Sequence, residues 1–149
     1  MREIKRIIIH CSDSNFGDAA TINNWHLQRG FDSIGYHYVV LSGIRYSGDD
    51  YNLQEDGMIE RGRGDTKQGA HVKGHNEDTI GICLIGKNAF TQKQLFVALP
   101  DLLLALVQKH NVLVANILGH RELDSKKTCP NLDMIDYRVY LTRYFAKPL

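Results

Sequence analysis

Two histidines and one cysteine stand out in the sequence for the chemistry that they could perform together. His10 follows the apolar run 7–9 and His120 follows the stretch 112–118, so each stands at the end of a predicted strand. Cys129 comes nine residues after His120, in a polar loop that can fold back beside it. Two imidazoles and one thiolate would bind zinc with three ligands and leave its fourth position open for water, as in catalytic zinc sites. The spacing alone makes them candidates and no more, because a histidine and a cysteine at this separation are common by chance.

The other two cysteines have ordinary structural interpretations. Cys83 lies within the apolar run 80–85, where a thiol packs as a small hydrophobic group. Cys11 faces the opposite side of an extended chain from its neighbour His10. Three cysteines cannot all pair, and an intracellular origin also argues against disulfides. Cys129 is therefore the cysteine that remains as a candidate metal ligand.

The composition is that of an ordinary globular protein. Of 149 residues, 43% are hydrophobic and 23% are charged, which excludes wholesale disorder, and the length suits one domain spanning 1–149. The formal charge of +1, without a basic run, gives no reason to expect nucleic-acid binding. No stretch approaches the roughly 20 apolar residues that membrane insertion requires. The residues before the first strand do not resemble a cleavable signal, so we expect a protein made in the cytoplasm. We also expect a monomer.

The order of the predicted elements indicates an α/β fold. Strands alternate with helices, which predicts a single domain with a central mixed β-sheet flanked by helices. The most apolar strand, 80–85, is expected at the centre. Thr91 and Gln94 fit a capping box at the start of the longest helix, in which Pro100 predicts a kink or a break. The expected strands are 7–10, 35–41, 58–61, 80–85 and 112–118, and the expected helices are a short one that ends at Gly30, then 91–110 and 132–145.

Five ordered blocks of the sequence resemble the zinc-dependent N-acetylmuramoyl-L-alanine amidases. The blocks read IIHCS at 8–12, GYHY at 35–38, GAHVKGHN at 69–76, IGICLIG at 80–86, and GHRE at 119–122 with KTCP at 127–130. The pattern looks most like the lysozymes, or endolysins, of T-odd bacteriophages, and it is similar also to the peptidoglycan recognition proteins of animals. The resemblance extends over residues 4–145, and the fixed order of the blocks makes it specific.

This resemblance implies hydrolysis of the amide between N-acetylmuramic acid and L-alanine in peptidoglycan. The enzyme would be a phage or prophage endolysin that acts on the periplasmic cell wall. The resemblance also implies a Zn²⁺ cofactor with His10, His120 and Cys129 as its ligands. Tyr36 matches the family's catalytic tyrosine, whose hydroxyl would bond a reacting oxygen. Lys127 matches its catalytic lysine, whose ammonium group would stabilise a developing oxyanion.

Several side chains near these blocks have alternative interpretations. His71 is expected to line the substrate groove. Lys126 is the alternative to Lys127 as the catalytic lysine. Glu122 would either orient an imidazole ligand or form a local pair with Arg121. Four further basic residues are weaker candidates for contacts with glycan or stem-peptide carboxylates, because surface charge is their ordinary interpretation: Arg61, Arg63, Lys73 and His75.

Three other functions stay open at this point. One is a recognition module that binds muropeptide without cutting it, which the presence of Lys127 disfavours. Another is a cytosolic amidase that recycles muropeptides, although such enzymes commonly have an aspartate in place of Cys129. The third is an endolysin that also inhibits the phage RNA polymerase, an inference that the short segment before His10 weakens.

Two departures from the family pattern bear on the site. The stretch 41–55 looks longer than a compact turn and is expected to extend a hairpin beside the groove. Asn131 stands where many relatives have glycine, which puts the backbone geometry of the Cys129 loop in question.

Overall fold

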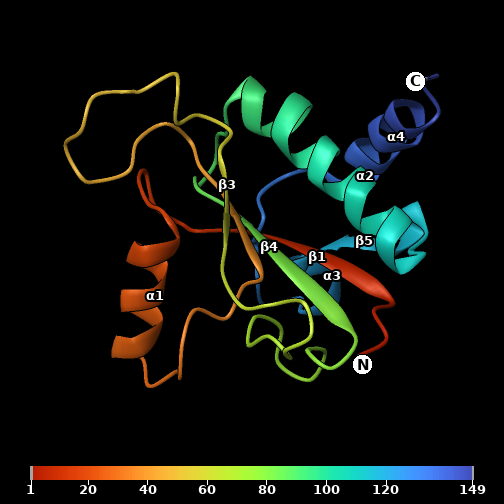
Figure 1. The fold of residues 1–149 in the computed structure, drawn as a ribbon, viewed down its shortest axis with the longest axis horizontal. Coiled ribbons are helices and arrows are strands. Elements are labelled where there is room, and N and C mark those ends of the chain that lie inside the picture. The colour runs from red at the N-terminus through yellow and green to blue at the C-terminus, as the bar shows by residue number, and fades with distance from the viewer. Residues whose placement is uncertain (1, 149) are drawn as a thin grey trace.

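A mixed β-sheet forms the centre of the molecule. The computed structural model describes residues 2–148, and within them five strands lie in the order β3-β2-β4-β1-β5 (Figure 1). β1 runs parallel to β4 and β5, β2 runs parallel to β4, and β3 pairs antiparallel with β2 at one edge. The predicted α/β fold is confirmed. The strand expected at the centre of the sheet is β4, and it is the middle strand of the five. The bounds are β1 Arg6–Cys11, β2 Tyr38–Val40, β3 Ile59–Arg61, β4 Thr79–Leu84 and β5 Ile117–Gly119.

Helices cover both faces of this sheet. The helices α2 (Leu99–His110) and α4 (Met134–Phe145) pack on one face, where Ile7 and Ile9 contribute to the larger apolar core. On the other face, α1 (Ala19–Gln28) covers a smaller core that includes Val39 and Cys83 (Figure 1). His10 is in register with Cys83, so its side chain points to the α1 face of the sheet. The His10 side chain thus lies on the opposite face of the sheet from the larger apolar core.

Local sequence signals start and end the helices, and the predicted helix end at Gly30 and the predicted capping box are confirmed. The Asp18 carboxylate accepts the Thr21 N–H at the start of α1, and Gly30, with a φ of +89°, follows its end. Thr91 and Gln94 exchange the two hydrogen bonds of a capping box, at 2.9 and 3.0 Å. Within residues 2–148, no helix combines the length and the apolar character that crossing a bilayer requires.

The longest helix is interrupted near Pro100. Its first turn, η1 (Gln94–Ala98), is π-helical and leads directly into α2. Proline has no N–H to offer the Phe96 carbonyl, and the Tyr140 hydroxyl of α4 donates to that oxygen at 3.4 Å. Tyr137, also on α4, donates to the Leu95 carbonyl at 2.6 Å. The predicted break is therefore a π turn, and hydroxyls from the neighbouring helix bond the carbonyls that it leaves without helical partners.

The predicted strand 112–118 is wrong for most of its length. Residues 114–116 form a 3-10 turn, η2 (Val114–Asn116), and the Asn116 N–H bonds the Leu113 carbonyl at 2.8 Å. Leu113 is 68% exposed, so the apolar residues that indicated a strand belong partly to a surface turn. Within this segment only β5, at 117–119, pairs with β1, and the short helix α3 (His120–Leu123) follows β5 at once.

The predicted strand 35–41 is also shorter in the structure. Its first residues bond a neighbouring loop instead of a strand: Gly35 and Tyr36 accept the N–H groups of Ala70 and Arg63, each at 3.0 Å. These bonds hold the block that contains Tyr36 against the loop 62–70, beside the sheet.

The excursion 41–55 contains neither helix nor strand, so the hairpin expected there does not form, yet the segment is firmly held. The Arg45 guanidinium contacts the carboxylates of Asp18, Glu55 and Glu60 at 2.8, 3.2 and 3.0 Å. Because Asp18 also caps α1, these ion pairs tie the excursion to the helix that covers the site face. The excursion projects beyond α1 in Figure 1.

Candidate metal and active site

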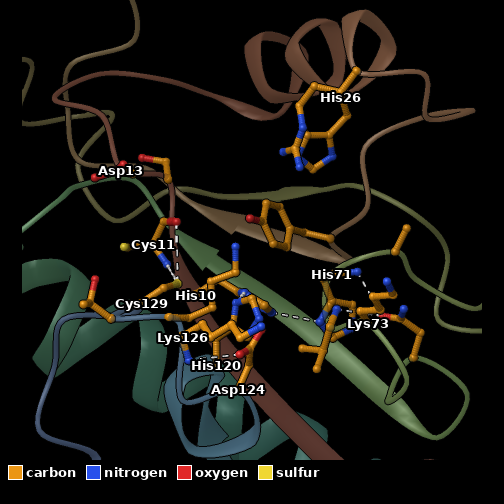
Figure 2. Close-up of a pocket in the computed structure, with 18 of the residues that line it drawn as sticks. His10, Cys11, Asp13, His26, His71, Lys73, His120, Asp124, Lys126 and Cys129 are labelled. Atoms are coloured by element: carbon orange, nitrogen blue, oxygen red, sulfur yellow. Dashed lines mark hydrogen bonds between the residues drawn. The ribbon is translucent and has the colours of Figure 1, made fainter.

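Two adjacent parallel strands and one returning loop bring the three candidate ligands together. His10 lies near the end of β1, and His120 directly follows β5, its parallel neighbour. The loop after α3 folds back because the Arg121 N–H bonds the Cys129 carbonyl at 2.8 Å. One donor atom from each of His10, His120 and Cys129 lies within 4.8 Å of the others. Figure 2 shows these side chains converging from β1, α3 and the loop.

The geometry of this donor set fits zinc. The Nδ1 atoms of His10 and His120 are 3.1 Å apart, and ligands of a tetrahedral zinc ion lie roughly 3.3–3.6 Å from one another. The Cys11 N–H points at the Cys129 sulfur at 3.0 Å, where it would stabilise a thiolate. Three ligands leave one position open, which is the arrangement of catalytic rather than structural zinc sites.

The surroundings set the protonation states of these ligands. Burial lowers the pKa of His10 well below its ordinary value, and the neighbouring rings of His71 and His120 lower it further. Burial also lowers the pKa of His120. Both imidazoles are therefore neutral at pH 7, which is the form that binds metal. The Cys11 side chain and burial raise the pKa of the Cys129 thiol, although the Cys11 backbone N–H opposes this rise. The thiol would therefore lose its proton only when a metal binds.

The three ligands stand in a groove of about 950 Å³ that is open to solvent. Tyr36, His71, Lys126 and Lys127 all line it. Among the described residues that line this groove, none comes from the excursion 41–55. That excursion borders a separate hollow of about 490 Å³, so its expected position beside the groove is wrong.

Tyr36 lies directly over the first ligand. Its ring centroid is 4.9 Å from that of His10 and 5.4 Å from that of His26 on α1. Burial, with a smaller contribution from the nearby thiols, raises the pKa of Tyr36 well above its ordinary value. The side chain is therefore a neutral phenol at pH 7 and can donate a hydrogen bond into the groove.

The two lysines differ in their relation to the ligands. Both are exposed residues of the loop after α3. The ammonium group of Lys127 contributes to the lowered pKa of His120, after burial, so it lies within electrostatic range of that ligand. Lys126 also borders the groove (Figure 2), but the charges that shift the pKa of His120 are those of Lys127 and Asp124.

His71 lies deeper than expected for a residue that contacts substrate. Its side chain is only 9% exposed, and its Nδ1 lies 2.8 Å from Nε2 of His10. Burial and nearby positive groups lower the pKa of His71 to about 3, so the ring is neutral. His71 therefore contacts the candidate ligand His10, and Figure 2 marks this contact with a dashed line.

The weaker candidates separate into groove and scaffold residues. Lys73 lines the groove, whereas Arg63 donates to the carbonyls of Ile34 and Gln68 and so holds the loop. Arg61 pairs with Asp65, away from the ligands. The ring of His75 is absent from the groove lining among the described residues.

Glu122 contacts neither an imidazole nor Arg121. Its carboxylate accepts the Gly119 N–H at 2.9 Å and pairs with Arg138 of α4 at 2.7 and 2.9 Å. These bonds fix the start of α3, where His120 stands, so Glu122 acts on the backbone of that ligand.

Two asparagines hold the loops around the site: Asn131, which the sequence analysis singled out, and Asn76, which it did not. Asn131 adopts a φ of +59°, a left-handed conformation that asparagine tolerates, and its amide donates to the Lys87 carbonyl at 2.8 Å. The substitution of the family's glycine thus leaves the turn intact. Asn76 accepts the N–H groups of His71 and Val72, both at 2.9 Å. Asn76 belongs to the KGHN part of the third block, so the sequence held a signal that it matters. Its hydrogen bonds to the His71 and Val72 N–H groups form only when the loop is folded.

Known proteins share this sequence pattern and this fold. The sequence pattern of the N-acetylmuramoyl-L-alanine amidase family matches residues 1–132. The chain is 31% identical to the endolysin of Escherichia phage T7 over 140 residues, which cover 86% of this chain and 81% of that protein. The solved structure of the N-acetylmuramoyl-L-alanine amidase LysC from Clostridium intestinale has a TM-score of 0.76 at 24% identity, and the match covers 95% of this chain and 87% of that one. Drosophila peptidoglycan recognition protein LB has a TM-score of 0.67 at 29% identity, over 87% and 76% of the two chains. The chain therefore belongs to the N-acetylmuramoyl-L-alanine amidase family.

Proposed function

We propose that this amidase is a zinc-dependent endolysin, which cleaves the amide between N-acetylmuramic acid and L-alanine in the bacterial cell wall. The observation that carries the proposal is the convergence of one donor atom each from His10, His120 and Cys129 within 4.8 Å, in a groove open to solvent. The endolysin of phage T7 is similar over most of both chains, which supports the endolysin assignment.

The proposed division of labour begins with the ligands. His10, His120 and Cys129 would hold the metal, and the first two are neutral at pH 7 because burial lowers their pKa values. Zinc bound there would supply an activated water at neutral pH and would polarise the carbonyl of the scissile amide. The Cys11 N–H, 3.0 Å from the Cys129 sulfur, would keep the thiolate in place.

Tyr36 and Lys127 would act on the reacting atoms. The phenol of Tyr36 keeps its proton at pH 7, because burial raises its pKa, and would donate a hydrogen bond to an oxygen of the substrate. The ammonium group of Lys127, on the exposed loop near His120, would stabilise the negative charge that develops on the carbonyl oxygen. One well-placed donor of this kind is worth about 3 kcal/mol of transition-state stabilisation.

The charge of the groove supports an acidic substrate. Four of its lining residues are basic and two are acidic, so it would attract the carboxylates of a peptidoglycan stem peptide. The charged lining residues are Arg29, Lys73, Lys126 and Lys127 on the basic side and Asp13 and Asp124 on the acidic side.

The test of this function is the identity of the bond that is cut. Purified peptidoglycan incubated with the protein is expected to release N-terminal alanine without new reducing sugars, and chelator is expected to abolish the release. New reducing ends would indicate a glycosidase instead. Faster cleavage of soluble anhydro-muropeptide than of intact sacculi would indicate a recycling enzyme rather than an endolysin.

A further inference from the structure

A buried row of hydrogen bonds leads from the loop 75–79 to the metal site. The Thr79 hydroxyl lies 2.8 Å from the His75 carbonyl and 3.2 Å from Nε2 of His71. The other ring nitrogen of His71, Nδ1, lies 2.8 Å from Nε2 of His10. Thr79 is fully buried and the two rings are nearly so. The row ends at Nδ1 of His10, the atom that faces His120.

The His75 carbonyl, at the start of the row, fixes which group donates in every hydrogen bond that follows. A carbonyl oxygen can only accept, so the single hydroxyl proton of Thr79 goes to the His75 carbonyl. The Thr79 oxygen must then accept from His71, which places a proton on Nε2 of that ring. A neutral imidazole has one N–H, so Nδ1 of His71 is an acceptor, and His10 must donate to it from Nε2.

We infer that His71 is a positioning residue, which holds His10 in the one tautomer whose Nδ1 lone pair is free to bind the metal. With its proton on Nε2, His10 presents an unprotonated Nδ1 toward His120, 3.1 Å away, and toward the Cys129 sulfur. A histidine ligand whose second nitrogen donates to a fixed acceptor is held in both tautomer and orientation. The acceptor here is a second histidine rather than the carboxylate or carbonyl that is common in this position.

The slot around His71 is shaped for its ring. A Cβ atom at Gly81 of β4 would lie 2.6 Å from Cγ of His71, and one at Gly69 would lie 2.6 Å from its Cδ2. Both glycines are therefore required for the ring to lie flat against the sheet. The backbone is fixed as well, because the Asn76 side chain accepts the His71 N–H at 2.9 Å. A side chain that only lined the groove for substrate would need none of these constraints.

Substitutions of His71 test the role through zinc affinity, measured by competition with a chromophoric chelator in the absence of substrate. His71→Phe keeps a flat ring but removes the acceptor, and we expect zinc affinity to fall about 10- to 100-fold. His71→Asn places an amide oxygen near the position of Nδ1, and we expect affinity within a few-fold of the wild type. His75→Asn is the matched control, since only the carbonyl of His75 belongs to the row.

The tautomers themselves are the second measurement, and they do not depend on any variant folding. Two-bond ¹H–¹⁵N spectra of the zinc-free wild-type protein should show both His10 and His71 protonated on Nε2. A His10 ring protonated on Nδ1 would overturn the inference. So would a folded His71→Phe protein, verified by circular dichroism, that binds zinc as tightly as the wild type.

This inference rests on the proposed metal site, but the two can fail separately. If the protein cuts no peptidoglycan while His71→Phe still weakens zinc binding, the proposed function fails and the positioning role stands. If the wild type is a zinc-dependent amidase and His71→Phe leaves zinc affinity unchanged, the positioning role fails alone.

Discussion

Burial governs the chemistry of the individual side chains in the groove. It lowers the pKa of His10 and raises that of Tyr36, so the imidazole and the phenol are both neutral at pH 7. Lys127, in contrast, is exposed, and its influence on His120 acts through space. The site therefore combines a buried interior, where the neutral forms of His10 and Tyr36 are favoured, with an exposed positive charge at its solvent side.

Replacing Lys127 tests the assignment of the catalytic lysine. Lys127→Met keeps the aliphatic stem and removes the ammonium group, so we expect kcat on purified peptidoglycan to fall about 100-fold. Zinc content should stay unchanged, because the side chain is not a ligand. Lys126→Met is the matched control and should cost less than about threefold. A larger loss in the Lys126 variant than in the Lys127 variant would reverse the assignment.

Replacing Tyr36 by phenylalanine separates its hydroxyl from its ring. Tyr36→Phe retains the packing against His10 and His26, so the thermal unfolding temperature and the zinc affinity should be preserved. We expect kcat to fall about 100-fold, since one hydrogen bond to a reacting oxygen is lost. Tyr46→Phe, at an exposed tyrosine of the excursion, provides the comparison. Wild-type kcat in Tyr36→Phe would remove the hydroxyl from the mechanism.

At the scale of elements, Gln94 joins the π turn to the sheet. Its amide nitrogen donates to the carbonyls of Val40 and Ile85 at 3.1 and 2.9 Å, just where β2 and β4 end. Its amide oxygen accepts the Thr91 N–H in the capping box. One fully buried side chain thus satisfies three backbone groups and aligns the helix with the two strands.

The stability of the protein should depend strongly on this glutamine. Gln94→Leu is close in size but leaves the buried Ile85 carbonyl without a donor, and the Val40 carbonyl keeps only the Ile85 N–H. We therefore expect the free energy of unfolding to fall by about 3 kcal/mol. Gln92→Leu, at an exposed position of the same segment, should change it by less than about 0.5 kcal/mol. Urea titrations of the two variants under identical conditions make the comparison. Equal free energies of unfolding for the Gln94→Leu and Gln92→Leu variants would show that the hydrogen bonds of Gln94 make no net contribution to stability.

The elements were predictable where the signals were local. The capping box of Thr91 and the glycine after α1 depend on neighbouring residues and appear as expected. The prediction of a strand over 112–118 was wrong because apolar residues indicate a buried strand only on average. Here Leu113 lies in an exposed turn. The π turn also could not be predicted, since it depends on hydroxyls from α4.

At the scale of the whole molecule, Asp65 connects distant parts of the chain opposite the groove. Its buried carboxylate accepts from the Tyr38 hydroxyl of β2 at 2.9 and 3.0 Å and from Lys109 of α2 at 3.0 Å. Arg2 donates to its carbonyl at 3.0 Å and to the Thr79 carbonyl at 3.2 Å. These bonds join the N-terminal segment, the loop 62–69 and the end of α2 to the strand that carries Thr79.

The pH dependence of stability should report on this carboxylate. Burial opposes its ionisation, but the bonds from Lys109 and Tyr38 outweigh burial and lower the pKa of Asp65. A lowered folded pKa contributes stability above the unfolded pKa of about 3.9, and this stability is lost as pH falls through the folded value.

Asp65→Asn should therefore cost about 2 kcal/mol at pH 7. The cost should stay constant down to about pH 5 and shrink below about pH 4. Urea unfolding in the presence of chelator measures this difference without a contribution from bound metal. A cost that is unchanged at about pH 2 would contradict the role of the charged form.

The site as a whole was only partly readable from the sequence. Spacing singled out His10, His120 and Cys129 as candidates, and the resemblance added Tyr36 and Lys127. The place of His71 could not be predicted, because its contacts with His10 and Thr79 connect three separate parts of the chain.

The central claim is that His10, His120 and Cys129 hold the zinc ion on which amide cleavage depends. The most direct measurement titrates chelator-treated protein with zinc and follows the release of N-terminal alanine from purified peptidoglycan. We predict that activity rises with added zinc and levels off at about one ion per chain, and that Cys129→Ser neither retains zinc nor regains activity. Full activity in the metal-free protein, or wild-type zinc binding and turnover in Cys129→Ser, would contradict the claim.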